Sequence, residues 1–328
     1  MEFAGDQLGS RFLQNKIETA TSEEKKRVFA EIENESMQLA QDIFGNYVLQ
    51  KMFEHGSQPQ KRILANGMKN KVFQLSTSAY GCRVVQKVCT FPHSYVVYSD
   101  SLQALDHVLS DQQYSLIQEL EPRVLECVKD QHGNHVIQKA FECAPAHQRK
   151  ALAQAFRGLV EKQSTHTFGC RIIQRMLEHC DDADRKWVLE ELHACTSKLI
   201  HDQFGNYVVQ HVIRKGAEVD RAAMVEVVKQ HPVWYSKHKF ASNVVEKSID
   251  NGNESQRRDI IASLTASTAG DTLLFELASD LYGNYVIRKS LFNSKVAYLT
   301  ALQKQLSKPS KERSKLHSRS ASSLFYQL

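Results

Sequence analysis

The sequence predicts an all-α repeat protein that forms one elongated solenoid. One seven-residue motif recurs eight times in the 328 residues, in forms such as FGNYVLQ at 44–50, HGNHVIQ at 132–138 and FGNYVVQ at 204–210. Successive copies stand 36 residues apart at five of the seven steps, and a fixed period of this length is typical of stacked helical repeats. Because each repeat of a solenoid packs mainly on its neighbours, we expect a single domain over residues 1–306.

Each copy of the motif fits one amphipathic helix. On a helical wheel of about 100° per residue, Val48 and Leu49 of the second copy fall on one side, and Asn46, Tyr47 and Gln50 fall on the other. The first side is expected to face the core, and the second to face solvent or a ligand. Further amphipathic and apolar segments lie between the copies, so each unit is expected to hold two or three short helices.

Four of the copies carry an aspartate four residues before the motif asparagine. A carboxylate at this place accepts hydrogen bonds from the first backbone N–H groups of a helix and favours its positive end. We therefore expect ordinary helix-start chemistry at Asp42, Asp130, Asp202 and Asp280.

Three segments depart from the repeat pattern, one of them the 42-residue step before the last copy, where we expect longer loops between helices. The step between copies three and four is 16 residues longer than the period, and the extra length falls within residues 91–109. Insertions in solenoids map to surface loops, so we expect a loop here, either mobile or involved in binding a partner. Residues 307–328 are basic and rich in serine, which predicts a disordered tail: a linker, an auxiliary phosphate contact or a segment controlled by phosphorylation. The short stretch before the first copy indicates that the end caps are incomplete.

Composition argues against several classes of protein. No apolar run approaches the length of a membrane span, so we expect no membrane partner. The N-terminus lacks the segments of a signal peptide, which predicts an intracellular protein. The seven cysteines form no CxxC pair, so neither a disulfide framework nor a zinc site is indicated. Because no HExxH, GxSxG or Walker-type motif occurs, we expect neither catalysis nor a cofactor.

Three positions of every copy lie on the polar side of the motif helix: the first, second and fifth residues after the glycine, or after Ala241 in the seventh copy. The second position holds Tyr, His or Arg in seven of the eight copies, and such flat groups can stack on exposed bases. In chain order the triplets are Ser10, Arg11, Gln14; Asn46, Tyr47, Gln50; Cys82, Arg83, Gln86; Asn134, His135, Gln138; Cys170, Arg171, Gln174; Asn206, Tyr207, Gln210; Ser242, Asn243, Glu246; and Asn284, Tyr285, Arg288.

The first and fifth positions have the chemistry to read base edges. A glutamine amide offers a donor and an acceptor, which match adenine where a small Ser or Cys at the first position leaves room for a purine. Asparagine with glutamine can satisfy uracil, which presents an N3 donor between two carbonyls. An ionised Glu246 only accepts hydrogen bonds, and the guanine Watson–Crick edge presents two adjacent donors. Copy seven is therefore expected to select guanine.

A polar triplet on one helix is usually a solvated face, but eight copies in register favour a reading function. The residue after the fifth position forms a basic row that either attracts a phosphate backbone or maintains solubility. A net charge of +5 permits a nucleic-acid partner without establishing one. The members of the basic row are Lys51, Lys87, Lys139, Arg175, His211, Lys247 and Lys289.

The period, the triplets and the phrases FGNYVLQ, HGNHVIQ, FGCRIIQ, FGNYVVQ and KFASNVVEK together resemble the Pumilio-homology (PUF) family of RNA-binding proteins. The resemblance runs from about Glu2 to Leu291. It implies a right-handed α-solenoid crescent of eight three-helix repeats, whose concave face binds single-stranded RNA with one base per repeat. It also implies that the last repeat meets the 5′ end, so that the triplets specify 5′-UGUAUAUA-3′.

The resemblance further implies cytoplasmic action on 3′ untranslated regions of mRNA, with repression or decay through recruited deadenylase factors. We expect a monomer. Arg288 replaces the glutamine expected in repeat eight and cannot accept the uracil N3 hydrogen, so the base preference there stays open. The insertion leaves an eight- or a nine-base site open. Two alternatives are an armadillo-like scaffold for proteins and a PUF-like protein that binds structured nucleic acid without a sequence code.

Overall fold

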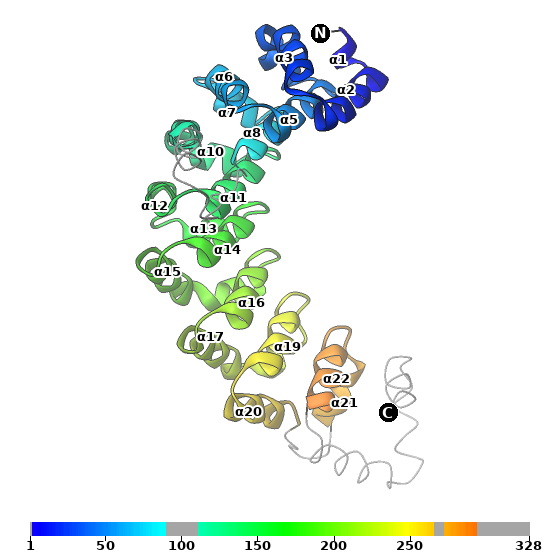
Figure 1. Ribbon diagram of the computed structural model, residues 1–328. Coiled ribbons are helices and arrows are strands. Elements are labelled where there is room, and N and C mark those ends of the chain that lie inside the picture. Colours follow the sequence, from blue (N-terminus) through cyan, green and yellow to red (C-terminus); the bar gives the residue numbers. More distant parts are fainter. Residues whose placement is uncertain (1, 90–110, 266–271, 294–328) are drawn as a thin grey trace. The chain divides into compact units, whose positions relative to one another are not determined.

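The computed structural model describes residues 2–89, 111–265 and 272–293, and these ranges are built of helices without strands (Figure 1). The all-α prediction is therefore confirmed for the described chain. The predicted loop within residues 91–109 and the predicted tail at 307–328 lie outside the described residues.

The repeating unit contains a short helix, a motif helix that carries the triplet, and a third helix. In repeat two these are α4 (Ser36–Leu39), α5 (Gly45–His55) and α6 (Gln58–Met68). The other motif helices are α2 (Gln7–Thr19), α8 (Gly81–Cys89), α11 (Gly133–Cys143), α14 (Gly169–His179), α16 (Gly205–Lys215), α19 (Ala241–Asn251) and α22 (Gly283–Asn293).

The remaining helices alternate with the motif helices along the chain. The short helices are α1 (Glu2–Gly5), α7 (Val72–Ser76), α10 (Val124–Lys129), α13 (Val160–Ser164), α18 (Pro232–Ser236) and α21 (Thr272–Ser279), with the 3-10 turns η1 (Glu33–Glu35) and η2 (Glu121–Arg123). The third helices are α3 (Ser22–Ile32), residues 111–120, α12 (Ala146–Gln154), α17 (Glu218–Gln230) and α20 (Glu254–Thr265). One helix, α15 (Asp182–His201), joins the third helix of repeat five to the short helix of repeat six.

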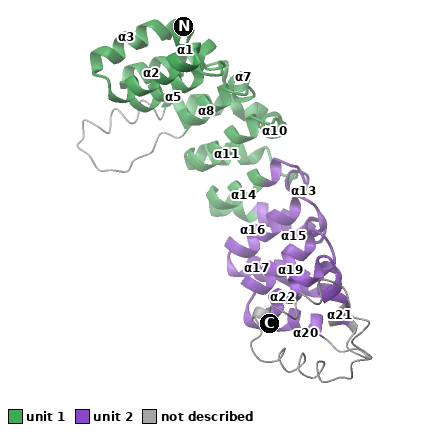
Figure 2. Cartoon of the chain, turned by 90° about the vertical axis from the view of Figure 1, so that its right-hand side faces the viewer, with its two compact units in different colours: residues 1–159, 171–186 green, residues 160–170, 187–328 purple. Residues whose placement is uncertain are grey.

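The chain divides into two compact units, residues 1–159 with 171–186 and residues 160–170 with 187–328 (Figure 2). The boundary passes through α14 and α15, so the units interleave in sequence. Within the first unit α2, α5, α8 and α11 pack in succession, and within the second α16, α19 and α22 do the same. The single domain over 1–306 stays a prediction.

The motif helices bury the side that the wheel assigns to the core. Val48 and Leu49 are at most 1% exposed, as are Val208 and Val209 in repeat six. Burial of branched apolar side chains from every repeat stabilises the stack by the hydrophobic effect. On the opposite side of the same helices, the second triplet position is exposed and the fifth is half-buried.

The motif glycine serves close packing between the motif helix and the short helix before it. A Cβ atom on Gly205 would lie 2.9 Å from Leu199 Cδ2 and 3.0 Å from the Leu199 backbone oxygen. These distances are too short for ordinary contact, so a larger residue would push the motif helix away. Ala241 holds the same place in repeat seven, where a Cβ atom is accommodated.

Candidate nucleic-acid interface

The motif helices begin at side-chain caps. Asp42 Oδ1 accepts hydrogen bonds from the backbone N–H groups of Phe44 at 2.8 Å and Gly45 at 2.6 Å. Asp130, Asp202 and Asp280 make the same pair of bonds, which confirms the predicted helix-start role.

Histidine serves as the cap in repeats five and seven, where aspartate is missing, which the sequence interpretation did not anticipate. His238 Nδ1 accepts from the N–H groups of Phe240 at 3.2 Å and Ala241 at 3.3 Å. His166 Nδ1 does so in repeat five. The signal was present in the sequence, because both histidines stand four residues before the first position, where aspartate stands in other repeats.

The three triplet positions share one pattern of exposure. The second position is exposed in all eight repeats, and the fifth is half-buried in all eight. The first position is buried in repeats one to seven and half-buried in repeat eight. The expectation that all three side chains are presented at the surface was therefore wrong for the first position. The reason is that this side chain folds back beneath its neighbours, onto the start of its own helix.

Hydrogen bonds fix the buried asparagines. Asn206 Nδ2 donates to the backbone oxygens of Asp202 at 2.8 Å and Gln203 at 3.0 Å, while Asn206 Oδ1 accepts from Gln210 Nε2 at 2.8 Å. Asn46 with Gln50 and Asn134 with Gln138 repeat this arrangement at 2.9 Å. The asparagine thus positions the glutamine amide, and no described residue donates to Gln210 Oε1. This oxygen and the second Nε2 hydrogen remain available to a ligand.

Where a small residue occupies the first position of the triplet, the glutamine at the fifth position makes a different hydrogen bond. Gln86 Nε2 donates to the backbone oxygen of Cys82 at 3.1 Å, because the thiol of Cys82 offers no amide partner. Cys82 is 3% exposed and occupies less volume than asparagine. The first position therefore controls both the bonding of the fifth side chain and the space beside it.

The planar second-position side chains of repeats two and three contact each other. Arg83 Nη1 donates to the Tyr47 hydroxyl at 2.6 Å, and the guanidinium carbon lies 5.7 Å from the centre of the Tyr47 ring. This separation is typical of a cation–π contact. A base that stacks between these groups must displace Arg83 from Tyr47.

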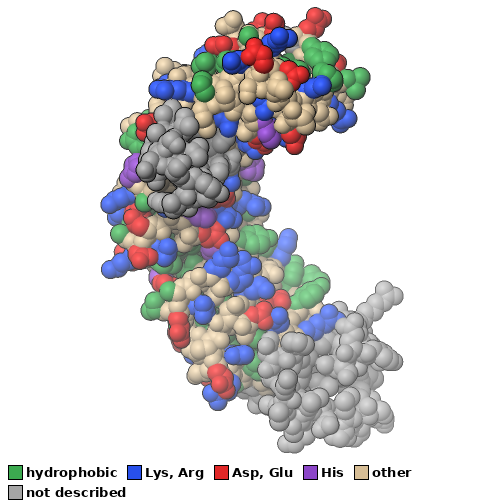
Figure 3. All heavy atoms as spheres, viewed as in Figure 1, with side chains coloured by type: hydrophobic (Ala, Val, Ile, Leu, Met, Phe, Trp, Pro, Cys, Tyr) green, Lys and Arg blue, Asp and Glu red, His purple; other side chains and the backbone are tan. Residues whose placement is uncertain are grey.

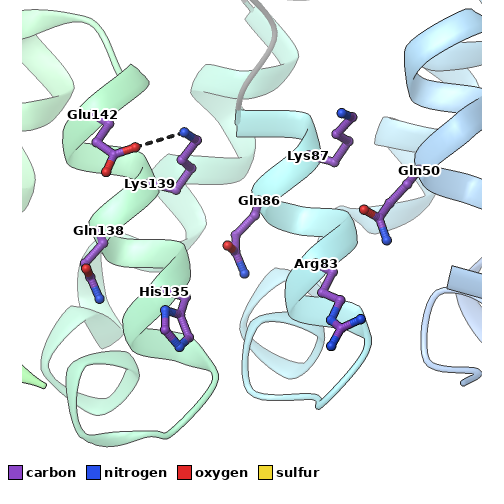
Figure 4. A pocket seen from close by; sticks show the side chains of 8 residues that line it. All are labelled: Gln50, Arg83, Gln86, Lys87, His135, Gln138, Lys139 and Glu142. Carbon is purple, nitrogen blue, oxygen red and sulfur yellow. Dashed lines mark hydrogen bonds and ion pairs between the residues drawn. The ribbon is translucent and has the colours of Figure 1, made fainter. Parts of the chain in front are cut away.

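A hollow of roughly 460 Å³ lies along the predicted reading side of repeats two to four (Figure 4). Three motif helices of the first unit supply its lining: α5, α8 and α11. The structure therefore brings together predicted residues that stand up to 88 positions apart in the sequence. The lining residues are Gln50, Arg83, Gln86, Lys87, His135, Gln138, Lys139 and Glu142.

Glu246, the proposed guanine reader, is half-buried on α19 beside the buried Ser242. Burial raises the pKa of its carboxyl group above the ordinary value, and Asp250 adds to this effect, whereas Lys247 and Lys289 oppose it. The carboxyl group is thus held in a site that favours its neutral form more than water does.

This raised pKa predicts a pH-dependent preference for guanine. Only the ionised carboxylate can accept from both guanine donors, so the preference should weaken as the pH falls through the raised pKa, with a midpoint above 4.5, the ordinary value. Fluorescence anisotropy with guanine- and adenine-containing RNA between pH 4.5 and 8 measures this. A preference that stays constant over the range would contradict the assignment.

The basic row is accompanied by an acidic row on the same helices, which the sequence interpretation missed. The acidic row consists of carboxylates eight residues after the first position: Glu18, Glu54, Glu142, Glu178 and Asp250. Lys51 lies 3.2 Å from Glu18 and 3.0 Å from Glu54, and Lys87 also pairs with Glu54. Although burial acts in the opposite direction, hydrogen bonds from Lys87 and Lys51 lower the pKa of Glu54.

Pairing therefore neutralises much of the basic row. Lys139 lies 2.9 Å from Glu142, and Arg175 pairs with both Glu142 and Glu178. The face seen in Figure 3 also shows basic and acidic side chains interspersed over the described residues. These contacts therefore do not indicate attraction of phosphate by an unbroken basic stripe. The signal in the sequence was an acid three residues after Lys51, Lys139, Arg175 and Lys247.

The described residues contain no group of three or more His, Cys, Asp or Glu side chains that could hold a metal ion. Among the described helices, none is both long and apolar enough to cross a membrane.

Comparisons with known proteins agree with the geometry. A family model described as the Pumilio-family RNA-binding repeat matches eight segments: 1–33, 37–67, 71–91, 123–155, 162–193, 197–229, 233–265 and 274–305. Over 64 residues the chain is 44% identical to the mRNA-binding protein PUF3 of Saccharomyces cerevisiae, a stretch that covers 17% of this chain and 7% of that protein.

Solved structures extend the similarity over nearly the whole chain. The Puf3 RNA-binding domain bound to the Cox17 RNA 3′ UTR recognition sequence site A is 37% identical, with a TM-score of 0.81 over 96% of this chain and 94% of that one. PUF-8 in complex with PBE-RNA is 31% identical, with a TM-score of 0.79 over 92% and 84%. Because the eight matched family repeats span most of the sequence, the chain belongs to the Pumilio family of RNA-binding repeat proteins.

Proposed function

We propose that this protein binds single-stranded RNA of the sequence 5′-UGUAUAUA-3′, with one base per repeat. The observation that carries the proposal is the repeated arrangement of an exposed planar side chain beside a half-buried glutamine or glutamate whose position the first residue controls. Such an arrangement offers a stacking surface and a hydrogen-bonding edge at each step. A protein-binding scaffold has no need of either feature in every repeat.

The bonding of the glutamines supports the assignment of bases. In repeat six, Gln210 Oε1 can accept from uracil N3 and its remaining Nε2 hydrogen can donate to a uracil carbonyl, while Asn206 fills the space beside it. In repeat three, Gln86 can donate to adenine N1 and accept from the adenine amine, and the small Cys82 leaves room for the purine. Glu246 accepts from guanine in repeat seven.

We further propose that the bound RNA is a 3′ untranslated region and that binding leads to repression or decay of the message in the cytoplasm. The Puf3 domain with 37% identity was solved with a 3′ UTR recognition sequence, which supports this assignment. Recruitment of deadenylase factors by a monomeric protein completes the proposal. Immunoprecipitation of the protein with its crosslinked RNA, followed by sequencing, identifies the bound regions.

The binding proposal predicts a large difference between two RNAs. The protein should bind 5′-UGUAUAUA-3′ at least tenfold more tightly than 5′-UAUAUAUA-3′, because base stacking and edge contacts each contribute about 1–3 kcal/mol and adenine cannot donate twice to Glu246. Fluorescence anisotropy with labelled RNAs at one salt concentration measures both affinities. Equal affinities would instead favour a PUF-like protein that binds nucleic acid without a sequence code.

A further inference from the structure

Ion pairs between neighbouring repeats follow one geometric rule. A basic-row cation reaches the acidic-row carboxylate of the preceding repeat: Lys51 lies 3.2 Å from Glu18, and Lys289 lies 2.8 Å from Asp250. Lys87 pairs with Glu54 in the same way, and Arg175 lies 3.9 Å from Glu142. The rule holds within both compact units. It shows that these two positions of successive motif helices are neighbours in space.

At the step from repeat six to repeat seven, a basic residue stands where the four steps named above have an acidic-row carboxylate. Arg214 of α16 stands at the acidic-row position, and Lys247 of α19 is the basic-row residue that follows it. Because α16 packs against α19 as the other successive motif helices do, the rule places the two cations next to each other. Opposite charges meet at the four steps named above, whereas two like charges meet here.

Neither cation is well neutralised by the described protein. Arg214 is exposed and makes no ion pair with another described residue. Lys247 lies 3.6 Å from Asp250, a carboxylate that it shares with Lys289 at 2.8 Å. An anion between Arg214 and Lys247 would relieve their repulsion and would meet the fork of donors that makes arginine a good phosphate ligand.

We propose that Arg214 and Lys247 bind one phosphodiester group of the RNA, at the linkage between the bases held by repeats six and seven. The inference rests on the proposed function. Arg214 and Lys247 lie one helical turn and one residue beyond the reading residues Gln210 and Glu246, respectively, so a strand that follows those residues runs its backbone past the cations. At the four steps named above, the cations are paired with carboxylates. Attraction to the RNA backbone is therefore concentrated at Arg214 and Lys247, beside the guanine-reading residue Glu246.

Arg214→Glu restores the acidic-row residue and tests the proposal through salt dependence. The affinity for 5′-UGUAUAUA-3′ should fall about tenfold at 0.1 M KCl, and the slope of log K against log[KCl] should shrink by about 0.7, the value for one phosphate on a single strand. Arg258→Glu makes the same change of charge on α20, at an arginine whose side chain is 72% exposed. This control should leave affinity and slope unchanged.

Neutralising one phosphate of the RNA at a time shows which linkage Arg214 and Lys247 contact. An RNA with a neutral methylphosphonate between its second and third bases should bind wild-type protein several-fold more weakly than unmodified RNA. The same modification should cost less in Arg214→Ala than in the wild type, because one of the two cations that meet this phosphate is already missing. A modification between the sixth and seventh bases, held by repeats two and three, should have little effect on either protein.

The outcomes separate this inference from the proposed function. If the wild-type protein does not prefer 5′-UGUAUAUA-3′ over 5′-UAUAUAUA-3′, the reading function itself is wrong. If that preference stands but Arg214→Glu binds with unchanged affinity and salt slope, the phosphate contact alone is overturned. An equal loss from the methylphosphonate in wild type and Arg214→Ala also overturns it.

Discussion

Glu246→Gln should abolish the preference for guanine at the second base while leaving the protein folded. Glutamine can accept from only one of the two adjacent guanine donors, and its own N–H group opposes the other. A good bidentate contact to a base contributes about 1–3 kcal/mol of discrimination, which corresponds to roughly 5- to 150-fold in relative affinity. Anisotropy with four RNAs that differ at this base measures the change.

The stability of the same variant provides the control. A raised pKa means that the folded protein binds the proton of Glu246 more tightly than the unfolded chain does. The stabilisation from the neutral form is therefore fully present at low pH and is lost as the pH rises through the raised pKa. Glutamine has no charge whose burial costs free energy. At pH 7, thermal unfolding of Glu246→Gln should therefore occur at the same temperature as that of the wild type or at a higher one. Reduced stability together with uniformly weaker binding of all four RNAs would mean that Glu246 is structural.

Phe141→Ala should produce the largest loss of stability among the variants considered. Phe141 is 0% exposed in α11, and its ring packs edge-on against Phe156 at 6.0 Å between centroids. Truncation of a buried phenylalanine leaves a cavity and costs about 3–5 kcal/mol. Urea denaturation followed by circular dichroism should show a clearly lower midpoint.

Phe12 provides a matched comparison, because it makes an edge-on contact of the same 6.0 Å with Phe3 but is 52% exposed. Phe12→Ala removes a similar ring pair without opening a buried cavity, so its midpoint should shift by a small fraction of the Phe141→Ala value. Phe141→Leu, which keeps most of the volume, should recover much of the loss. Equal shifts for Phe141→Ala and Phe12→Ala would show that burial does not determine the cost.

Periodic features of the fold could be predicted because each repeat encounters nearly the same surroundings. The helical wheel assigned Val48 and Leu49 to the core and Tyr47 to the surface, and the structure agrees. The aspartate caps followed from local hydrogen bonding between residues two and three positions apart. By contrast, α15 runs without interruption from repeat five into repeat six, because no residue between Asp182 and His201 stops the helix.

At the candidate site, the sequence pattern predicted which side of the helix each residue occupies but not its contacts. By itself, the sequence determined which residues share the polar side of each motif helix, because that depends only on the 3.6-residue turn. The structure added that Asn206 is buried and positions Gln210, through carbonyl partners in the backbone turn just before the helix. It also decided that Lys51 is paired with Glu18, a contact across 33 residues that arises because the motif helices stack side by side.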